Sequence, residues 1–239
     1  RVIFHSARMS GTDRRTRKAA ALENALANER LLQWMRQLEN PPLLVYVSGT
    51  LVYGSRGQKE ADENTPLSPT SFQREYFTAA RPVLEALYKQ KLPVVIVRPA
   101  WIYGPGSWFQ LFYLNSLQTK NRVPVYGDGK NLMNLIHVRD TASRIIHAAE
   151  NGQPGNVYNL FQEKAVSQQQ FTQILSETTG FPQKRLPDWW LRLRYGRAVA
   201  EAFDFSLNLR TKHAGMWSNF TPYFPDFETW FINYWSGVS

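Results

Sequence analysis

The segment LLVYVSGTLVYG, residues 43–54, decides the fold of this chain. It opens with five consecutive apolar residues, Leu43 to Val47, and then becomes polar and glycine-containing. A short, uninterrupted apolar run is typical of a strand that is buried on both faces of a parallel sheet. Residues 2–5 and residues 92–97 form two further runs of this kind. We therefore expect three strands of one sheet, each covered on both sides.

The stretches between these runs carry the patterns of helices. A polar loop is expected over residues 10–18, followed by a helix over residues 19–38 that the Pro41-Pro42 pair ends. A second helix is predicted over residues 72–90, where Pro82 marks a kink. The expected inward face of the first helix consists of Leu22, Ala25, Leu26, Leu32 and Met35.

Alternating strands and helices predict βαβ units, and the expected fold class is α/β with a doubly wound parallel sheet. Ser167 and Gln170 form a capping-box pattern that opens another helix, and Gly180 ends it. The remaining elements are expected as helices over residues 108–118 and 139–150 and as strands over residues 134–138 and 156–160.

The composition of the 239 residues is that of a globular protein, with 43% apolar and 20% charged residues. No apolar run reaches the length of about 18 residues that a membrane span requires. The chain contains no Cys, which excludes disulfides and a Cys nucleophile and is compatible with a reducing, cytoplasmic location. The net charge of +9 favours anionic partners. No nucleic-acid-binding motif is present, so no nucleic-acid partner is expected.

Several segments resemble motifs of the NAD-dependent epimerase/dehydratase family, the extended short-chain dehydrogenases. They follow one another in the order in which the family carries them, over residues 2–185. On this resemblance the chain is identified as a member of the family. The matching segments are VIFHSA (residues 2–7), Asn24, VYVSGTLVYG (45–54), RPAWIYGPG (98–106), GDG with NLIHVRD (127–140) and YNL (158–160).

The resemblance implies a Rossmann-type fold that binds NAD or NADP and acts on a small-molecule substrate. Residues 1–160 would form the nucleotide-binding domain, and residues 161–239 a smaller α-rich substrate or lid region with interleaved segments from about 105–135. Family members begin with a GxxGxxG turn that holds the cofactor pyrophosphate, and no such turn occurs in these 239 residues. We therefore expect roughly 60–90 residues to precede this chain in the intact protein. A natural half-domain is the alternative.

The family's catalytic residues are a Ser or Thr together with a Tyr and a Lys in a YxxxK pair. In the family the Tyr moves a proton at the substrate oxygen, the Lys stabilises the charged Tyr, and the Ser or Thr hydrogen-bonds the same oxygen. Family spacing puts Gly49 at the Ser/Thr position, Phe72 at the Tyr position and Tyr76 at the Lys position. In this register the three positions lack the side chains of the usual triad. The chain therefore resembles an atypical branch of the superfamily that keeps the fold without that triad.

A shift of one helical turn would restore part of this site. Tyr76 would become the catalytic Tyr and Thr50 the hydroxyl group, while Ala80 would stand at the Lys position with Arg81 beside it as a source of positive charge. Thr50 and Tyr76 are therefore the catalytic candidates. The resemblance also implies cofactor contacts, at the carboxyl ends of the strands. These are Ala7, Ser48, Tyr76, Pro99, Ala100 and Ile102.

Two functions remain open at this point. The first is an NAD(P)-dependent oxidoreductase or epimerase-like enzyme, and the alternative is a catalytically inactive dinucleotide-binding sensor or scaffold. Nucleotide-sugar epimerases carry an Arg four residues before the HV His, where this chain has Met133. Loss of that anion clamp favours a small substrate that is not a nucleotide sugar. The resemblance also implies a homodimer through two helices, one of them over residues 72–90.

Other polar residues are interpreted as structural. His5 and His137 are expected to be buried in strands, and Glu60, Asp62 and Glu63 are interpreted as a solvated acidic loop. No metal site is expected, because the histidines are too widely spaced for a ligand set. They are His5, His137, His147 and His213.

Overall fold

A parallel sheet forms the centre of the molecule. The structure is a computed structural model of the chain and describes residues 1–7, 14–69, 71–89 and 92–237. In this part of the chain the sheet has the order β1-β2-β4-β8, and each neighbouring pair is parallel. The α/β class and the parallel sheet predicted from the apolar runs are thereby confirmed. The strands are β1 (Val2–His5), β2 (Leu43–Val47), β4 (Val94–Pro99) and β8 (Val157–Leu160).

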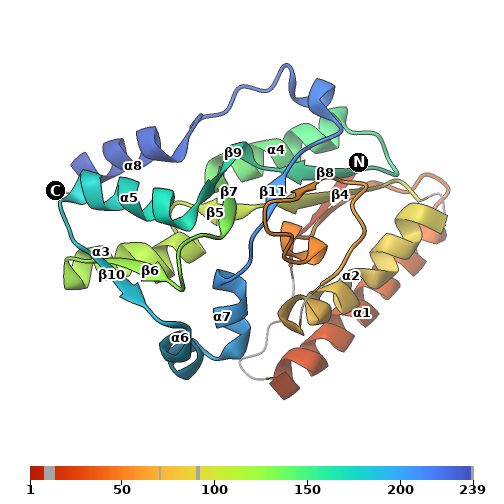
Figure 1. Cartoon of the computed structure of the whole chain (residues 1–239). Helices are drawn as coiled ribbons and strands as arrows, with labels where there is room; N and C mark the ends of the chain where they lie inside the picture. Colours follow the sequence, from red (N-terminus) through yellow and green to blue (C-terminus); the bar gives the residue numbers. More distant parts are fainter. Residues whose placement is uncertain (8–13, 70, 90–91, 238–239) are drawn as a thin grey trace.

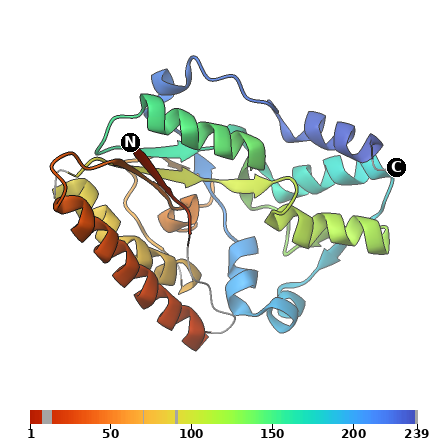
Figure 2. The ribbon, with the colours of Figure 1, turned by 180° about the vertical axis from the view of Figure 1, so that it is seen from behind.

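Helices cover both faces of this sheet, because successive strand residues point to opposite sides. Leu44, Val94 and Ile96 pack on one face against α1 (Arg14–Arg36) and α2 (Ser71–Lys89). Their sequence neighbours Val45, Val95 and Val97 pack on the other face, where α4 (Val138–Asn151) lies. Figures 1 and 2 show the resulting three layers from opposite sides. This two-sided burial is why β2 and β4 read as continuous apolar runs. The expectation that residues 2–5 are also covered on both sides is wrong, because β1 is the edge strand and leaves Val2 and Phe4 43% and 51% exposed.

The first helix differs from its prediction in its start and in its buried face. It begins at Arg14, so the part of the expected loop over residues 14–18 is helical, and residues 8–13 lie outside the described residues. Leu22 and Leu26 were expected to face inward but are 59% and 52% exposed. Leu32 and Met35 are buried as predicted, but the rest of the buried stripe runs through Ala21 and Asn28. Apolar spacing alone did not show where α2 packs against α1.

A second core holds the C-terminal part of the chain, and it is built from aromatic rings. Phe109, Phe171, Phe227 and Phe231 are buried in it, with ring centroids 4.5 to 6.0 Å apart. Its strands and helices lie beside the main sheet (Figure 1). They include β5 (Trp101–Tyr103), β6 (Val123–Tyr126), β7 (Leu132–His137), β9 (Gln162–Ser167), β10 (Gln183–Leu186), η2 (Gln110–Leu114), α3 (Asn115–Lys120), α5 (Gln168–Thr179), α6 (Asp188–Tyr195), α7 (Arg197–Phe203) and α8 (Phe227–Ser236).

Local sequence signals in this region have mixed outcomes. The capping box is present, since Ser167 Oγ accepts from the Gln170 amide at 3.1 Å and Gln170 Oε1 accepts from the Ser167 amide at 2.8 Å. Gly180 ends α5 with a left-handed φ of 70°. The helix expected over residues 108–118 is present, but its residues 110–114 form a π-helical turn, η2, before α3.

A buried polar network ties the loop after β2 to the sheet. The Tyr53 hydroxyl, in η1 (Thr50–Tyr53), donates to Asn159 Oδ1 at 2.8 Å and accepts from Arg98 Nη1 at 2.8 Å. Glu63 is also buried, which corrects its interpretation as part of a solvated loop: its carboxylate accepts from the backbone amides of Asn159 and Lys212. Buried charges are tolerated where they are hydrogen-bonded in this way. The network fixes η1, which follows the end of β2.

Two further short strand and helix segments complete the described chain. Strand β3 (Glu60–Ala61) pairs in parallel with β11 (Asn208–Leu209), and η3 (Ala214–Trp217) follows β11.

Asp140, fully buried in the first turn of α4, accepts from the backbone amides of Tyr223 and Phe224 at 2.6 and 3.1 Å. This carboxylate fixes the segment that leads into α8. None of the described helices is both long enough and apolar enough to cross a membrane.

Candidate functional site

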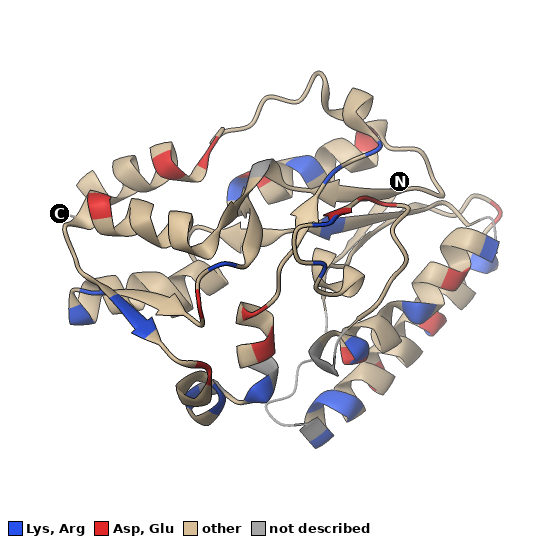
Figure 3. Cartoon of the chain, in the orientation of Figure 1, with Lys and Arg blue, Asp and Glu red and all other residues tan. Residues whose placement is uncertain are grey.

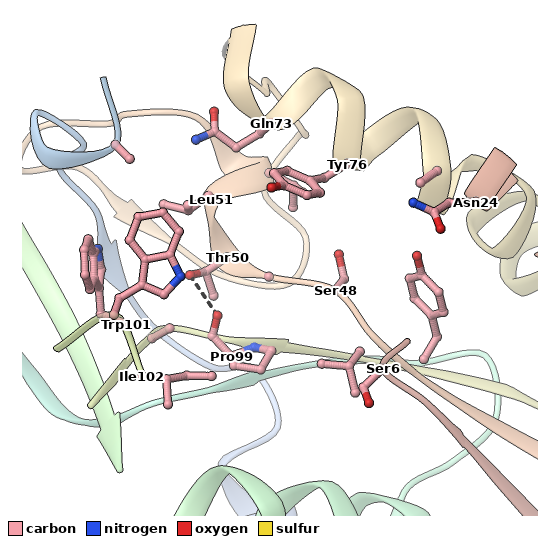
Figure 4. Close-up of a pocket in the computed structure, with 18 of the residues that line it drawn as sticks. Ser6, Asn24, Ser48, Thr50, Leu51, Gln73, Tyr76, Pro99, Trp101 and Ile102 are labelled. Carbon is pink, nitrogen blue, oxygen red and sulfur yellow. Dashed lines mark hydrogen bonds between the residues drawn. The ribbon is translucent and has the colours of Figure 1, made fainter. Parts of the chain in front are cut away.

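A cavity of about 350 Å³ lies at the carboxyl ends of β1, β2 and β4. In open α/β sheets this is where ligands bind, because the loops that follow the strands diverge there. Figure 4 shows Tyr76 and Gln73 on α2, on the side of the cavity opposite Ser48 and Pro99. Trp101 and Leu51 lie at one end of the cavity, and Asn24 lies at the other.

The floor of the cavity comes from the turn after β2. Gly49 has an extended φ of −172°, and a Cβ added there would have no heavy atom within 4 Å. Thr50 is buried at the start of η1, and its hydroxyl donates to the Pro99 carbonyl at 3.3 Å. The Thr50 proton is thus used within the protein, and its oxygen lone pairs remain the groups that could accept from a ligand.

The wall opposite comes from α1 and α2, which Asn28 holds together. The Asn28 side chain is buried, donates to the Ala79 carbonyl in α2 at 2.7 Å and contacts His5 Nε2 in β1 at 2.7 Å. One amide therefore connects α1, α2 and the edge strand of the sheet. Tyr76, one turn before Ala79, is half-buried at the cavity.

The structure brings the predicted site residues together. All the expected cofactor contacts and both catalytic candidates line this one cavity, although they come from β1, β2, α2 and β4 and the segments that follow them. The position of Gly49 lines it as well. The Phe72 side chain lies outside the described residues. The residues brought together are Ala7, Ser48, Gly49, Thr50, Tyr76, Pro99, Ala100 and Ile102.

Arg81 does not take the place that the shifted register offered it. Its side chain is 72% exposed and forms an ion pair with Glu85 at 3.0 Å. It lies with Tyr88 beside a separate surface depression of α2, while Ala80 is buried. The prediction that Arg81 supplies positive charge beside Tyr76 is wrong, because one residue corresponds to about 100° around a helix and turns the side chain away.

Several lining residues were not predicted, among them Asn28, Gln73, Trp108 and Ala202. Asn28 and Gln73 lie one helical turn from Asn24 and Tyr76, so the helical repeat around those two residues could have identified them. Trp108 and Ala202 also line the cavity. They reach it only through the packing of the aromatic core, as α7 lies against α2. No local sequence signal marks that packing.

The cavity is uncharged. Among the described residues that line it there is no Asp, Glu, Lys, Arg or His. The described part of the chain also contains no group of three or more His, Cys, Asp or Glu side chains that could hold a metal ion. Hydroxyl and amide groups are the polar groups that face the cavity: Ser6, Asn24, Asn28, Tyr46, Ser48, Thr50, Gln73 and Tyr76.

A parallel sheet covered on both faces, with a cavity at the carboxyl ends of its strands, defines a Rossmann-like protein. Residues 1–160 match the sequence model of the NAD dependent epimerase/dehydratase family. The chain therefore belongs to this family, whose members are enzymes of the short-chain dehydrogenase superfamily.

Two curated human relatives illustrate the similarity. dTDP-D-glucose 4,6-dehydratase from Homo sapiens is 28% identical over 153 residues, which are 61% of this chain and 43% of that protein. Short-chain dehydrogenase/reductase family 42E member 1 from Homo sapiens is 30% identical over 212 residues, 77% of this chain and 53% of that protein. The chain thus spans about half or less of the length of these relatives.

Solved structures share the fold. dTDP-glucose 4,6-dehydratase from Bacillus anthracis in complex with NAD superposes with a TM-score of 0.73 at 23% identity, covering 99% of this chain and 72% of that chain. The human epimerase family protein SDR39U1 with NADPH superposes with a TM-score of 0.77 at 18% identity, covering 94% and 78%. Structures with this fold therefore bind either NAD or NADPH.

Proposed function

We propose that the protein is an NAD(P)-dependent oxidoreductase of the epimerase/dehydratase type and that the cavity is its active site. The substrate would be a small molecule that reacts at a carbinol or carbonyl carbon. One observation carries the proposal: the cofactor positions Ser48, Pro99, Ala100 and Ile102 share a single cavity with the hydroxyl-bearing side chain of Tyr76. The relatives' binding of NAD and NADPH supports the choice of cofactor.

The residues present fit the nicotinamide riboside part of such a cofactor. That part is uncharged, and so is the described lining of the cavity. The hydroxyls of Ser48 and Tyr76 and the amide of Asn24 can hydrogen-bond ribose hydroxyls or a carboxamide. Pro99, Ala100 and Ile102 offer an apolar surface for a flat ring. When bound, the cofactor supplies the hydride acceptor or donor of the reaction.

Tyr76 is the proposed proton-transferring group, and its hydroxyl would exchange a proton with the substrate oxygen. Thr50 would contribute an acceptor oxygen, since its proton is donated to Pro99. When bound, the oxidised cofactor would supply the hydride acceptor for an alcohol substrate. Tyr76, once it has lost its own proton, would take the proton of the substrate hydroxyl, which would leave a carbonyl group. The walls formed by α2 and by Trp101 would limit the access of water.

The alternative function is a dinucleotide-binding sensor or scaffold without turnover. A specific observation favours it: Gly49 contributes no side-chain hydroxyl, and no Lys or Arg is among the described lining residues. Such a protein would bind the cofactor and transfer no hydride. Cofactor binding is therefore common to both functions, and turnover separates them.

Homodimerisation through α1 and α2 is the expected mode of association. Support comes from the outward sides of these helices, where Leu26, Trp34 and Tyr88 are 52%, 47% and 64% exposed. Large apolar side chains left exposed on the surface occur at protein interfaces.

Calorimetric titration of the intact protein with NADH and NADPH tests the proposed function. We expect micromolar binding of one of them. Ser48→Trp should abolish it by filling the polar end of the cavity near Asn24, while Ser218→Trp, at an exposed position after η3, should leave it unchanged. If the native protein binds neither cofactor at millimolar concentration, the proposal is refuted. Circular dichroism checks that both variants are folded.

A further inference from the structure

Two indole rings form the end of the cavity farthest from Asn24. The ring centroids of Trp101 and Trp108 are 6.0 Å apart, and their planes meet at 81°. Trp101 is supported from behind by Phe203 at 5.7 Å, and Trp108 is stacked on Phe112 at 5.2 Å. The two indoles are thus held at nearly a right angle, as two walls of one corner.

This corner is apolar and partly open. Leu51 and Ala202 also line the cavity, and Trp108 keeps 39% of its surface exposed. An indole held rigidly at a cavity with this much exposed surface is a preformed contact for a ligand, because covering it removes apolar area from water at little entropic cost. Aromatic walls favour flat or ring-shaped ligands.

The charge of the site argues against a diphosphate at this end. A bound diphosphate requires cationic side chains or a cluster of amide donors, and the described lining has no Lys, Arg or His. The Lys and Arg residues lie mainly on the outer helices and on β10 (Figure 3). Met133, at the position where nucleotide-sugar epimerases carry Arg, is buried in the aromatic core.

We propose that the substrate is an uncharged alcohol or ketone carried on a largely apolar ring system. The ring would lie against Trp101 and Trp108, and its oxygen would point toward Tyr76. This inference rests on the proposed function, since it assigns the substrate class of the same site. Trp108 would then be a specificity-determining residue, and the amide of Gln73, which also lines the cavity, would offer a second hydrogen bond to the substrate oxygen.

The test uses two probes, 2-tetralone as a neutral bicyclic ketone and dTDP-glucose as a charged nucleotide sugar. Each is titrated calorimetrically into the intact protein, with and without the nicotinamide cofactor that binds. We expect 2-tetralone to bind and dTDP-glucose not to bind at the same millimolar concentration. If dTDP-glucose binds more tightly, the inference is overturned, because a nucleoside diphosphate then occupies the site.

Trp108→Ala locates the binding. We expect it to weaken 2-tetralone binding by about tenfold or more, the equivalent of one lost aromatic contact with its buried area. The matched control is Trp189→Ala, since Trp189 is 66% exposed and is not part of the cavity. Cofactor affinity should not change in either variant. Unchanged 2-tetralone affinity in Trp108→Ala would overturn the inference.

The two proposals fail in distinguishable ways. Absence of NADH and NADPH binding would refute the proposed function. Binding of a cofactor without any binding of 2-tetralone would leave the cofactor site in place and refute only the substrate class.

Discussion

The two ends of the cavity are built from different parts of the molecule. The end near Ser6, Asn24 and Ser48 is polar and is formed by the parallel strands and α1. The end near Trp101 and Trp108 is apolar and is supported by the aromatic core. The difference teaches that one cavity can combine a polar end set by the sheet with an apolar end set by a separate core, which on the proposed function would hold the cofactor and the substrate respectively. Tyr76 lies between the two ends (Figure 4).

Tyr76→Phe should have the largest effect on this arrangement. The substitution removes only the hydroxyl, so the fold and cofactor affinity should persist. Turnover of a ring alcohol should fall by about 100-fold or more, because acid–base groups contribute about 10²–10⁴-fold. Tyr88→Phe, on the same helix but 64% exposed, should leave turnover unchanged. Steady-state kinetics with both variants decides the point, and full activity in Tyr76→Phe would remove this residue from the mechanism.

Gly49→Ser should have a smaller, opposite effect. The backbone there is extended, and an added Cβ meets no heavy atom within 4 Å, so the side chain fits without strain. It would supply a hydroxyl near Thr50 at the position where the family carries its Ser or Thr. We expect turnover to rise by about tenfold, a modest share of what one such hydrogen bond contributes.

Gly215→Ser provides the control for Gly49→Ser, since a Cβ at Gly215 is equally unhindered and this residue is outside the cavity. Turnover that is zero in the native protein and stays zero in Gly49→Ser, with cofactor still bound, would favour the sensor or scaffold function.

The smallest effect concerns pH and the aromatic core. His137 is buried beside Phe224 and Trp230, and its Nδ1 accepts from the Arg139 amide at the start of α4. Burial lowers the pKa of His137 below its ordinary value of 6.5, against the opposing charge of Asp140. The unfolded chain therefore takes up a proton at a higher pH than the native protein. Stability contributed by neutral His137 is complete above pH 6.5 and is lost as the pH falls below it.

His137→Asn should flatten this pH dependence while keeping a side-chain cap for α4. The slope that one group adds cannot exceed about 1.4 kcal/mol per pH unit. Denaturant unfolding at several pH values below and above 6.5 measures how the free energy of unfolding changes with pH. His213→Asn serves as a second variant, because burial also lowers the pKa of His213. An identical slope in native protein and His137→Asn would contradict the assignment.

The sequence predicted the polar end of the cavity better than the apolar end, for a physical reason. Ser48, Pro99 and Ala100 lie at or just after the carboxyl ends of β2 and β4, whose two-sided burial produces continuous apolar runs. Parallel pairing brings these strand ends to one edge of the sheet. The positions of these residues in space thus follow from local patterns and one rule of topology.

The apolar end depends on tertiary packing that local patterns do not encode. Trp108 precedes a π-helical turn where an ordinary helix was expected, and Ala202 reaches the cavity because α7 packs against α2. The exposure of Leu22 has the same origin. In each case the side of a helix that is buried is set by its partner helix rather than by its own sequence.

The central claim is that one cavity has a cofactor end and a substrate end with separate binding residues. Parallel titrations of Ser48→Trp and Trp108→Ala with the bound nicotinamide cofactor and with 2-tetralone test it most directly. The account predicts a crossed result, in which Ser48→Trp loses the cofactor and Trp108→Ala loses the ketone, each keeping the other ligand. Equal weakening of both ligands in both variants, with the folds intact, would contradict it.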